Sequence, residues 1–162
     1  MKYNNYVQKV IKDNKYLERL AQKYSAAFPE IFYEGNPAID VCLEAVKENG
    51  NLLAFIEKQT PSICLAAVKQ NVDALEFAKV QTDKLCLGAV RQDWYALKYV
   101  NQQTEEICLA AVKQNGYALY YVDQQTPEIC LEAVRNNPEA IRFVDQEFKE
   151  AVKATIVQDV NK

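Results

Sequence analysis

Five evenly spaced cysteines constrain what this chain can fold into more than any other feature of its sequence. Each lies 22 residues after the one before it, and the segments between them align without gaps. The third and fourth segments, CLGAVRQDWYALKYVNQQTEEI and CLAAVKQNGYALYYVDQQTPEI, are identical at 15 of 22 positions. Self-similarity at a fixed period of this length indicates a repeat protein. The cysteines are Cys42, Cys64, Cys86, Cys108 and Cys130.

Each repeat predicts two short helices. Thr60 and Thr126 are suited to cap the first helix, because a proline follows each of them at the first helical position. Thr82 and Thr104 occupy the same position in the other repeats. The first helix carries an apolar stripe and ends near an asparagine that two repeats follow with glycine, where we expect a left-handed or turn conformation. The second helix carries the next apolar residues and runs to the following threonine, and Pro138 can start it.

A helix of about 8–10 residues is unstable alone in water, so its apolar stripe needs a neighbouring repeat to cover it. The sequence therefore predicts an all-α fold, an α-solenoid of stacked helical hairpins in a single domain. We expect an N-terminal helical cap over 1–36, five repeats over 37–151, and a C-terminal capping helix over 152–162.

The unit CLAAVKQNGYALYYVDQQTPEI resembles the short repeats of the family catalogued as domain of unknown function 4116. That family repeats a core of the form CLxAVxxNGxALxxV, and the likeness covers residues 37–151. It departs at Val72, Trp94 and Pro138, which stand where the family has glycine. The resemblance implies a helical repeat fold and carries no established activity.

Composition removes several classes of function. The chain has no histidine, which is the commonest general base and metal ligand. It shows no phosphate-binding glycine loop and no nucleophile elbow, so we expect neither an enzyme nor a cofactor. The net charge of -3 disfavours nucleic acid as a partner. The N-terminal segment MKYNNYVQKV has no apolar core of a signal peptide, and no stretch is long enough to span a membrane. We therefore expect a cytoplasmic protein, either monomeric or a weak homo-oligomer.

The cysteine column is predicted to be structural. Helices in adjacent layers pack about 8–10 Å apart, whereas a disulfide needs Cα atoms about 4.4–6.8 Å apart. A column also cannot converge on one metal ion, so we expect no metal site. The thiols are interpreted as small buried apolar groups.

Two polar columns also repeat. A basic residue ends each first helix, where the helix dipole favours a cation; stacked, these residues could also form a track for an acidic peptide or a phosphate backbone. They are Lys47, Lys69, Arg91, Lys113 and Arg135. A glutamine precedes each threonine cap and is expected to hydrogen-bond the loop backbone between layers. These glutamines are Gln59, Gln81, Gln103 and Gln125, and Glu147 follows in the same column.

The columns that vary are the best candidates for binding. Two positions of the second helix lie three residues apart and so share a face. In the third and fourth repeats this face becomes aromatic and lies beside cations, which is the composition of an interaction hot spot. The candidate partner-binding residues are Trp94, Tyr95, Lys98, Tyr117, Tyr120 and Arg142. A second aromatic column is expected in the core between layers: Phe55, Phe77, Tyr99, Tyr121 and Phe143.

These features favour a protein-interaction module that binds through the outward faces of its second helices. One alternative is an inhibitor or immunity-type protein that masks a toxin or a defence enzyme, for which a small acidic chain is suited. A second alternative is nucleic-acid binding along the basic column, which predicts steeply salt-dependent affinity. A third is a structural subunit that stacks end to end.

Overall fold

The structure is a computed structural model that describes residues 39–56 and 58–160. The chain divides into two compact units, Met1–Val80 and Gln81–Lys162. We call their described parts the N-terminal unit and the C-terminal unit. The N-terminal helical cap expected over 1–36 lies outside the described residues.

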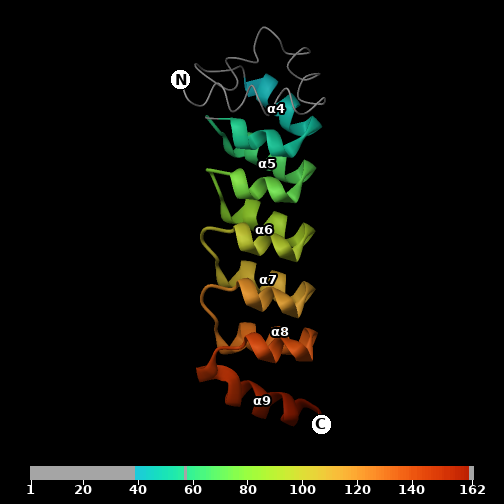
Figure 1. Ribbon diagram of the computed structural model, residues 1–162, viewed down its shortest axis with the longest axis vertical. Coiled ribbons are helices and arrows are strands. Elements are labelled where there is room, and N and C mark those ends of the chain that lie inside the picture. Colours follow the sequence, from blue (N-terminus) through green and yellow to red (C-terminus); the bar gives the residue numbers. More distant parts are fainter. Residues whose placement is uncertain (1–38, 57, 161–162) are drawn as a thin grey trace. The chain divides into compact units, whose positions relative to one another are not determined.

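Every regular element in the described ranges is a helix, and the helices alternate between two kinds (Figure 1). An α-helix of ten residues is followed by a six-residue 3₁₀ helix, and we call this pair a layer. The N-terminal unit holds two layers: α4 (Ile39–Glu48) with η1 (Gly50–Phe55), and α5 (Pro61–Gln70) with η2 (Val72–Phe77). The predicted all-α, solenoid-like repeat fold is confirmed.

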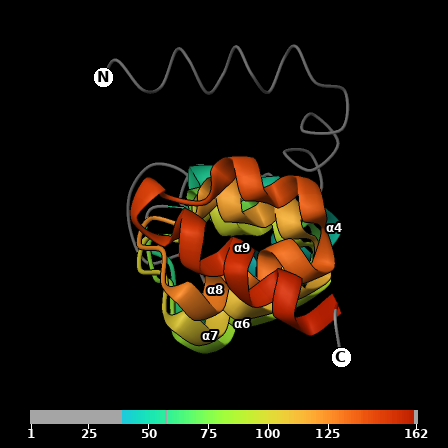
Figure 2. The same cartoon turned by 90° about the horizontal axis from the view of Figure 1, so that it is seen from below.

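The C-terminal unit holds three layers and a longer final helix. The layers are α6 (Asp83–Gln92) with η3 (Trp94–Tyr99), α7 (Glu105–Gln114) with η4 (Gly116–Tyr121), and α8 (Pro127–Asn136) with η5 (Pro138–Phe143). The final helix is α9 (Gln146–Val160), which lies nearest to the viewer in Figure 2. It begins at Gln146, before the boundary of 152 expected for the capping helix. Within it Val152 is buried, whereas Val157 is 60% exposed.

Threonine caps begin four of the α-helices, as the sequence predicts. In each case the hydroxyl oxygen accepts a hydrogen bond from the backbone N–H three residues later. The distance is 3.3 Å between Ile63 N and Thr60 Oγ1, and 3.3 Å between Ile129 N and Thr126 Oγ1. Such a side chain satisfies one of the backbone donors that a helix start leaves unpaired. The start of each layer is therefore fixed locally.

The second helix of each layer differs from the expectation, because it is a 3₁₀ helix and ends well before the next threonine. In the fourth repeat it ends at Tyr121, and Val122 is already extended. If η4 continued as an α-helix, the Tyr121 carbonyl would accept a hydrogen bond from the backbone N–H four residues later. Here Gln103 of the preceding layer occupies that carbonyl, with Nε2 2.8 Å from Tyr121 O. A side chain from the layer before thus satisfies the last carbonyl of the helix.

Asparagine or aspartate joins the two helices of each layer in an extended conformation, in place of the left-handed or turn conformation expected. Asn115 has φ -151° and ψ 118°. Its backbone N–H donates to Ala111 O and closes α7, while its side chain accepts from Tyr117 N at 2.9 Å and opens η4. Asn71, Asp93 and Asn137 do the same. The turn is therefore unchanged where Val72, Trp94 and Pro138 replace glycine.

The core of each unit is built from the same few positions in every layer. Each of the helices α5 to α8 turns four residues inward, such as Ile107, Cys108, Ala111 and Val112. Each of η2 to η4 turns an Ala/Leu pair inward, whereas η1 buries two leucines and η5 buries Ala140. No polar or charged residue is buried in the described ranges. Burial of apolar surface between layers is the dominant favourable term in such folding.

The glutamine column joins neighbouring layers within each unit, which confirms the role expected for it. Gln103 Nε2 donates to Tyr121 O of the following layer, and Gln103 Oε1 accepts from Asp123 N at 3.0 Å. In the N-terminal unit, Gln59 makes the equivalent pair of bonds with Phe77 O at 2.9 Å and Lys79 N at 2.8 Å. Gln81 and Gln125 repeat the arrangement. Each amide thereby satisfies one backbone acceptor and one backbone donor at a layer junction.

A second column of amide side chains, not expected from the sequence, bonds the preceding layer instead of the following one. Gln114 Oε1 accepts from Trp94 N of the preceding layer at 2.6 Å, and its Nε2 donates to Arg91 O at 3.0 Å. Asn136 bonds Gly116 N and Lys113 O in the same way. The sequence does carry a pattern that predicts this column, because Gln or Asn follows the basic residue in four of the five repeats.

Candidate functional site

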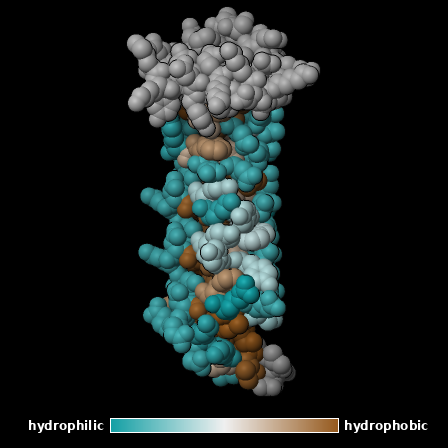
Figure 3. All heavy atoms as spheres, viewed as in Figure 1, coloured by the Kyte–Doolittle hydropathy of each residue, from teal (hydrophilic) through white to brown (hydrophobic). Residues whose placement is uncertain are grey.

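The aromatic side chains of η3, η4 and η5 form a continuous group on the C-terminal unit. We call it the aromatic surface. It is made of Trp94, Tyr95, Tyr117, Tyr120, Tyr121 and Phe143. In Figure 3 pale spheres, the colour of residues of intermediate hydropathy such as tyrosine, gather on the face of this unit turned to the viewer.

The 3₁₀ geometry explains how these rings reach the surface. With three residues per turn, side chains three apart point the same way. Leu119 and Val122 are therefore turned together into the core, and Tyr117 and Tyr120 lie together on the outer face. The predicted face thus points away from Leu119 and Val122, as expected. Tyr120 is 65% exposed and Tyr95 38%, whereas Trp94 and Tyr117 are half-buried.

The rings contact one another across layers, mostly edge to face. Tyr95 of η3 meets Tyr121 of η4 with ring centroids 5.4 Å apart and planes at 90°. Tyr120 of η4 meets Phe143 of η5 at 5.4 Å and 67°. The distances fall in the range that aromatic pairs prefer, where a pair contributes about 0.5–1.5 kcal/mol beyond its buried area. Contacts of this kind hold the exposed rings in fixed positions before any ligand arrives.

Two cations of the predicted set lie against these rings. Lys98 Nζ is 3.9 Å from the Tyr95 ring centroid, and Arg142 Cζ is 4.8 Å from that of Phe143. Both are within the roughly 6 Å over which a ring attracts a cation. Hydrogen bonds with the hydroxyl groups of Tyr99 and Tyr95 also raise the pKa of Lys98. Arg142 is exposed and Lys98 is half-buried.

The structure brings together all six residues predicted to bind a partner, and it adds others. Tyr121 and Phe143 were expected in the core between layers, together with Phe55, Phe77 and Tyr99. Instead this whole column is only half-buried, and Phe77 is 36% exposed. In η2 to η5 a small buried alanine lies in the core three residues earlier, and the larger ring extends to the rim. Glu139 also joins the surface, since Tyr117 donates its hydroxyl to Glu139 Oε2 at 2.8 Å.

The basic column lies on another part of the layers, in the last turn of each α-helix, as expected. All five side chains are exposed. In the C-terminal unit they form ion pairs: Arg91 with Glu106 at 3.6 Å, Lys113 with Glu132 at 3.8 Å, and Arg135 with Glu132 at 3.1 Å. These acidic partners reduce the positive potential that a nucleic-acid track would need.

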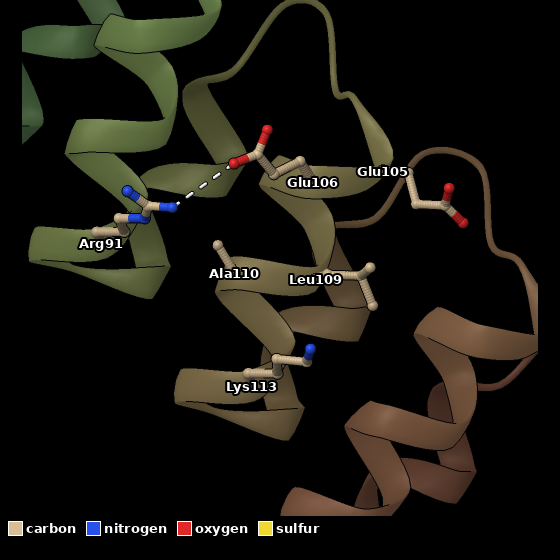
Figure 4. Close-up of a pocket in the computed structure, with 6 residues that line it drawn as sticks. All are labelled: Arg91, Glu105, Glu106, Leu109, Ala110 and Lys113. Atoms are coloured by element: carbon tan, nitrogen blue, oxygen red, sulfur yellow. Dashed lines mark ion pairs between the residues drawn. The ribbon is translucent and has the colours of Figure 1, made fainter.

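An open hollow of about 540 Å³ lies beside this column on α6 and α7. Figure 4 shows Arg91 and Glu106 pointing toward one another at its edge, near Ala110 and Leu109. Lys113 and Glu105 complete the lining. The hollow thus joins a small apolar patch to charges of both signs.

The cysteines are buried in every layer, as predicted, and all five are free thiols. Four of them donate S–H to the glutamine five residues earlier, at S–O distances from 3.2 to 3.6 Å. Burial raises the pKa of Cys86, Cys108 and Cys130 to about 11. Thiols that stay protonated at neutral pH are poor nucleophiles.

In the described residues between 39 and 160, no helix combines the length and apolar character needed to cross a bilayer. Within the same described ranges, no three potential metal-ligating side chains of histidine, cysteine, aspartate or glutamate lie close enough to hold an ion.

Comparison with known proteins identifies the repeat. No curated protein and no solved structure matches the chain. The family model described as "Domain of unknown function (DUF4116)" matches residues 39–81 and 104–149, which together make up more than half of the chain. Its two matched segments cover α4 to η2 and α7 to η5. This chain belongs to the DUF4116 family.

Proposed function

We propose that this chain is a cytoplasmic protein-interaction module that binds a protein partner through the aromatic surface of η3, η4 and η5. The observation that carries the proposal is the exposure of Tyr120 and Tyr95 within a group of rings already ordered by mutual contacts. Tyrosine and tryptophan are enriched where proteins bind one another. Rings that are ordered in advance lose little conformational entropy on binding.

The distribution of charge favours this function over nucleic-acid binding. On the basic column, three of the five cations form ion pairs with glutamates. The chain as a whole carries a net charge of -3. Nucleic-acid affinity arises largely from cations that neutralise phosphates. The acidic chain is also compatible with an inhibitor of a basic protein, which is one form of the proposed function.

Capture of partners from extracts of the native host tests the proposal. The quadruple variant Trp94→Ala, Tyr95→Ala, Tyr117→Ala and Tyr120→Ala should lose the proteins that the unchanged chain retains. Capture that is undiminished in this variant would reject the aromatic surface as the binding site.

A matched control changes equivalent positions of the N-terminal unit. The triple variant Val72→Ala, Asp73→Ala and Glu76→Ala alters the outward columns of η2 and should keep full capture. Far-ultraviolet circular dichroism and thermal unfolding should show that both variants remain folded. Equal loss in both variants would contradict a site confined to the aromatic surface.

A further inference from the structure

One outward row that crosses the aromatic surface alternates between cationic and aromatic side chains. Lys98, Tyr120 and Arg142 occupy the same position in three successive layers of the C-terminal unit. Tyr120 is the most exposed large apolar side chain in the described ranges, at 65%. The row therefore presents a cation, an exposed ring and a second cation, one to each layer.

The spacing of this row follows from helix packing. Packed helices lie about 8–10 Å apart, so Lys98 and Arg142 are separated by about 16–20 Å along the row. Their cationic groups lie over Tyr95 and Phe143, at 3.9 Å and 4.8 Å from the ring centroids. Each contact fixes a positive charge at the edge of an apolar area.

We propose that the partner presents to this row an extended, proline-rich peptide with two carboxylates six residues apart. This inference rests on the protein-binding function proposed above. A polyproline II segment advances about 3.1 Å per residue and completes a turn in three residues. Six residues therefore span about 19 Å, which is the separation of two layers. The two carboxylates meet Lys98 and Arg142, and the proline midway between them lies over Tyr120.

The chemistry of the surface fits such a peptide. Polyproline II has no internal hydrogen bonds, so its carbonyl groups remain available as acceptors. Tyrosine hydroxyl groups can donate to them, and aromatic-lined surfaces are a recurring site for proline-rich segments. The carboxylate of Glu139 lies on the same surface, where it accepts the Tyr117 hydroxyl at 2.8 Å. It repels a phosphate backbone, with a negative charge on every nucleotide, more than a peptide with only two carboxylates. Charge complementarity at only the two ends of the row favours the peptide.

Synthetic peptides can test this inference on the full chain. The probe is acetyl-EPPPPPE-amide carrying a fluorophore, with binding measured by fluorescence anisotropy at low salt. Two comparison peptides are EEPPPPP, which has the same composition with adjacent carboxylates, and KPPPPPK. We expect EPPPPPE to bind roughly three- to tenfold more tightly than either, because each exposed ion pair contributes about 0.2–1 kcal/mol.

Charge reversal sharpens the test. The double variant Lys98→Glu and Arg142→Glu should invert the preference and bind KPPPPPK more tightly than EPPPPPE. In the unchanged chain, Tyr120→Ala should weaken binding of EPPPPPE. Added to the double variant, it should weaken binding of KPPPPPK. Circular dichroism of each variant establishes that loss of binding does not reflect unfolding.

Several results would overturn the inference. Equal affinity for the three peptides, no measurable binding of EPPPPPE, or an unchanged preference after charge reversal would each do so. Tighter binding of a single-stranded oligothymidylate than of EPPPPPE would favour nucleic acid instead. If the quadruple aromatic variant loses its partners while EPPPPPE fails to bind, the proposed function stands and only this peptide class is rejected.

Discussion

The 3₁₀ helices of the two units share a backbone design and differ in what they present to solvent. Asn71 opens η2 with φ -146° and ψ 118°, and Asn115 opens η4 with φ -151° and ψ 118°. Both helices end at a carbonyl that a glutamine of the preceding layer binds. The outward positions are Asp73 and Glu76 in η2, but Tyr117 and Tyr120 in η4. The outward side chains can therefore change while the fold stays the same.

This comparison separates two sets of columns. The glutamines, the capping residues and the buried apolar residues form the layer, and they recur in both units. The outward columns contribute little to layer formation and are free to specify a partner. Substitutions in the layer-forming set should therefore change the free energy of unfolding by similar amounts in both units. Substitutions in the outward columns should change it by different amounts in the two units.

The largest expected effect is the loss of a glutamine that joins layers. Gln103→Ala removes the partners of Tyr121 O and Asp123 N. It should lower the free energy of unfolding by about 1–3 kcal/mol, because the part-buried Tyr121 carbonyl is left without a partner. Gln59→Ala should cost a similar amount, since its contacts are equivalent. Urea unfolding measures both. The exposed neighbour Gln102→Ala is the control, and a cost as large as that of Gln103→Ala would contradict a special role for the glutamine column.

Gly116 tests how closely layers approach. A Cβ on Gly116 would collide with Ala133 O and lie 2.9 Å from Asn137 Cβ in the next layer. Gly116→Ala should therefore lower the free energy of unfolding by about 1–3 kcal/mol through overpacking. Gly50→Ala in η1 meets Ala67 O in the same way and should match it. Neutral behaviour of both in thermal unfolding would show that the layers can adjust to a methyl group at little cost.

Tyr120 and Glu76 occupy the same outward column in different units. Replacing each by alanine should therefore change the free energy of unfolding by different amounts. Tyr120→Ala removes ring contacts with Tyr121 and Phe143 at centroid distances of 5.0 and 5.4 Å, and it should cost about 1 kcal/mol. Glu76→Ala, an exposed change outside such contacts, should stay within about 0.5 kcal/mol of zero. Calorimetric unfolding of the two variants provides the measurement. A larger loss of unfolding free energy for Glu76→Ala than for Tyr120→Ala would contradict this prediction.

The smallest expected effect is a gain. Gly88 lies inside α6, and a Cβ there would meet no other atom within 4 Å. Gly88→Ala should raise the free energy of unfolding by about 0.5–1 kcal/mol, because glycine loses more backbone entropy in a helix than alanine does. Its equivalents Ala66 and Ala110 already carry a methyl group. A loss of stability in urea unfolding would mean that this face of α6 is more crowded than it is in the structure.

Much of the fold follows from the sequence because its signals are local or periodic. The period of 22 residues gives the layers, and the threonines mark the start of each α-helix. The glutamine column could also be assigned to the layer junctions, since a polar side chain repeated next to a loop needs a repeated partner.

The 3₁₀ character of the second helices could not be predicted in this way. Alanine, leucine and valine at 118, 119 and 122 fit either a 3.0 or a 3.6 period over so short a segment. The contact at the end of the helix is also non-local, because Gln103, which binds the Tyr121 carbonyl, lies 18 residues earlier. The same error placed Tyr121 and Phe143 in the core, although their rings lie at its rim beside the predicted site.

The hydrogen bonds of the glutamine column bear on how such chains change length in evolution. Each glutamine bonds residues 18 and 20 positions later, and both partners are backbone atoms. A backbone partner is present whatever residue occupies the position. An in-frame duplication or deletion of one whole repeat within a unit would thus return every glutamine to an equivalent partner. Lineages can therefore lengthen or shorten the array by unequal recombination while each added copy acquires its own outward residues.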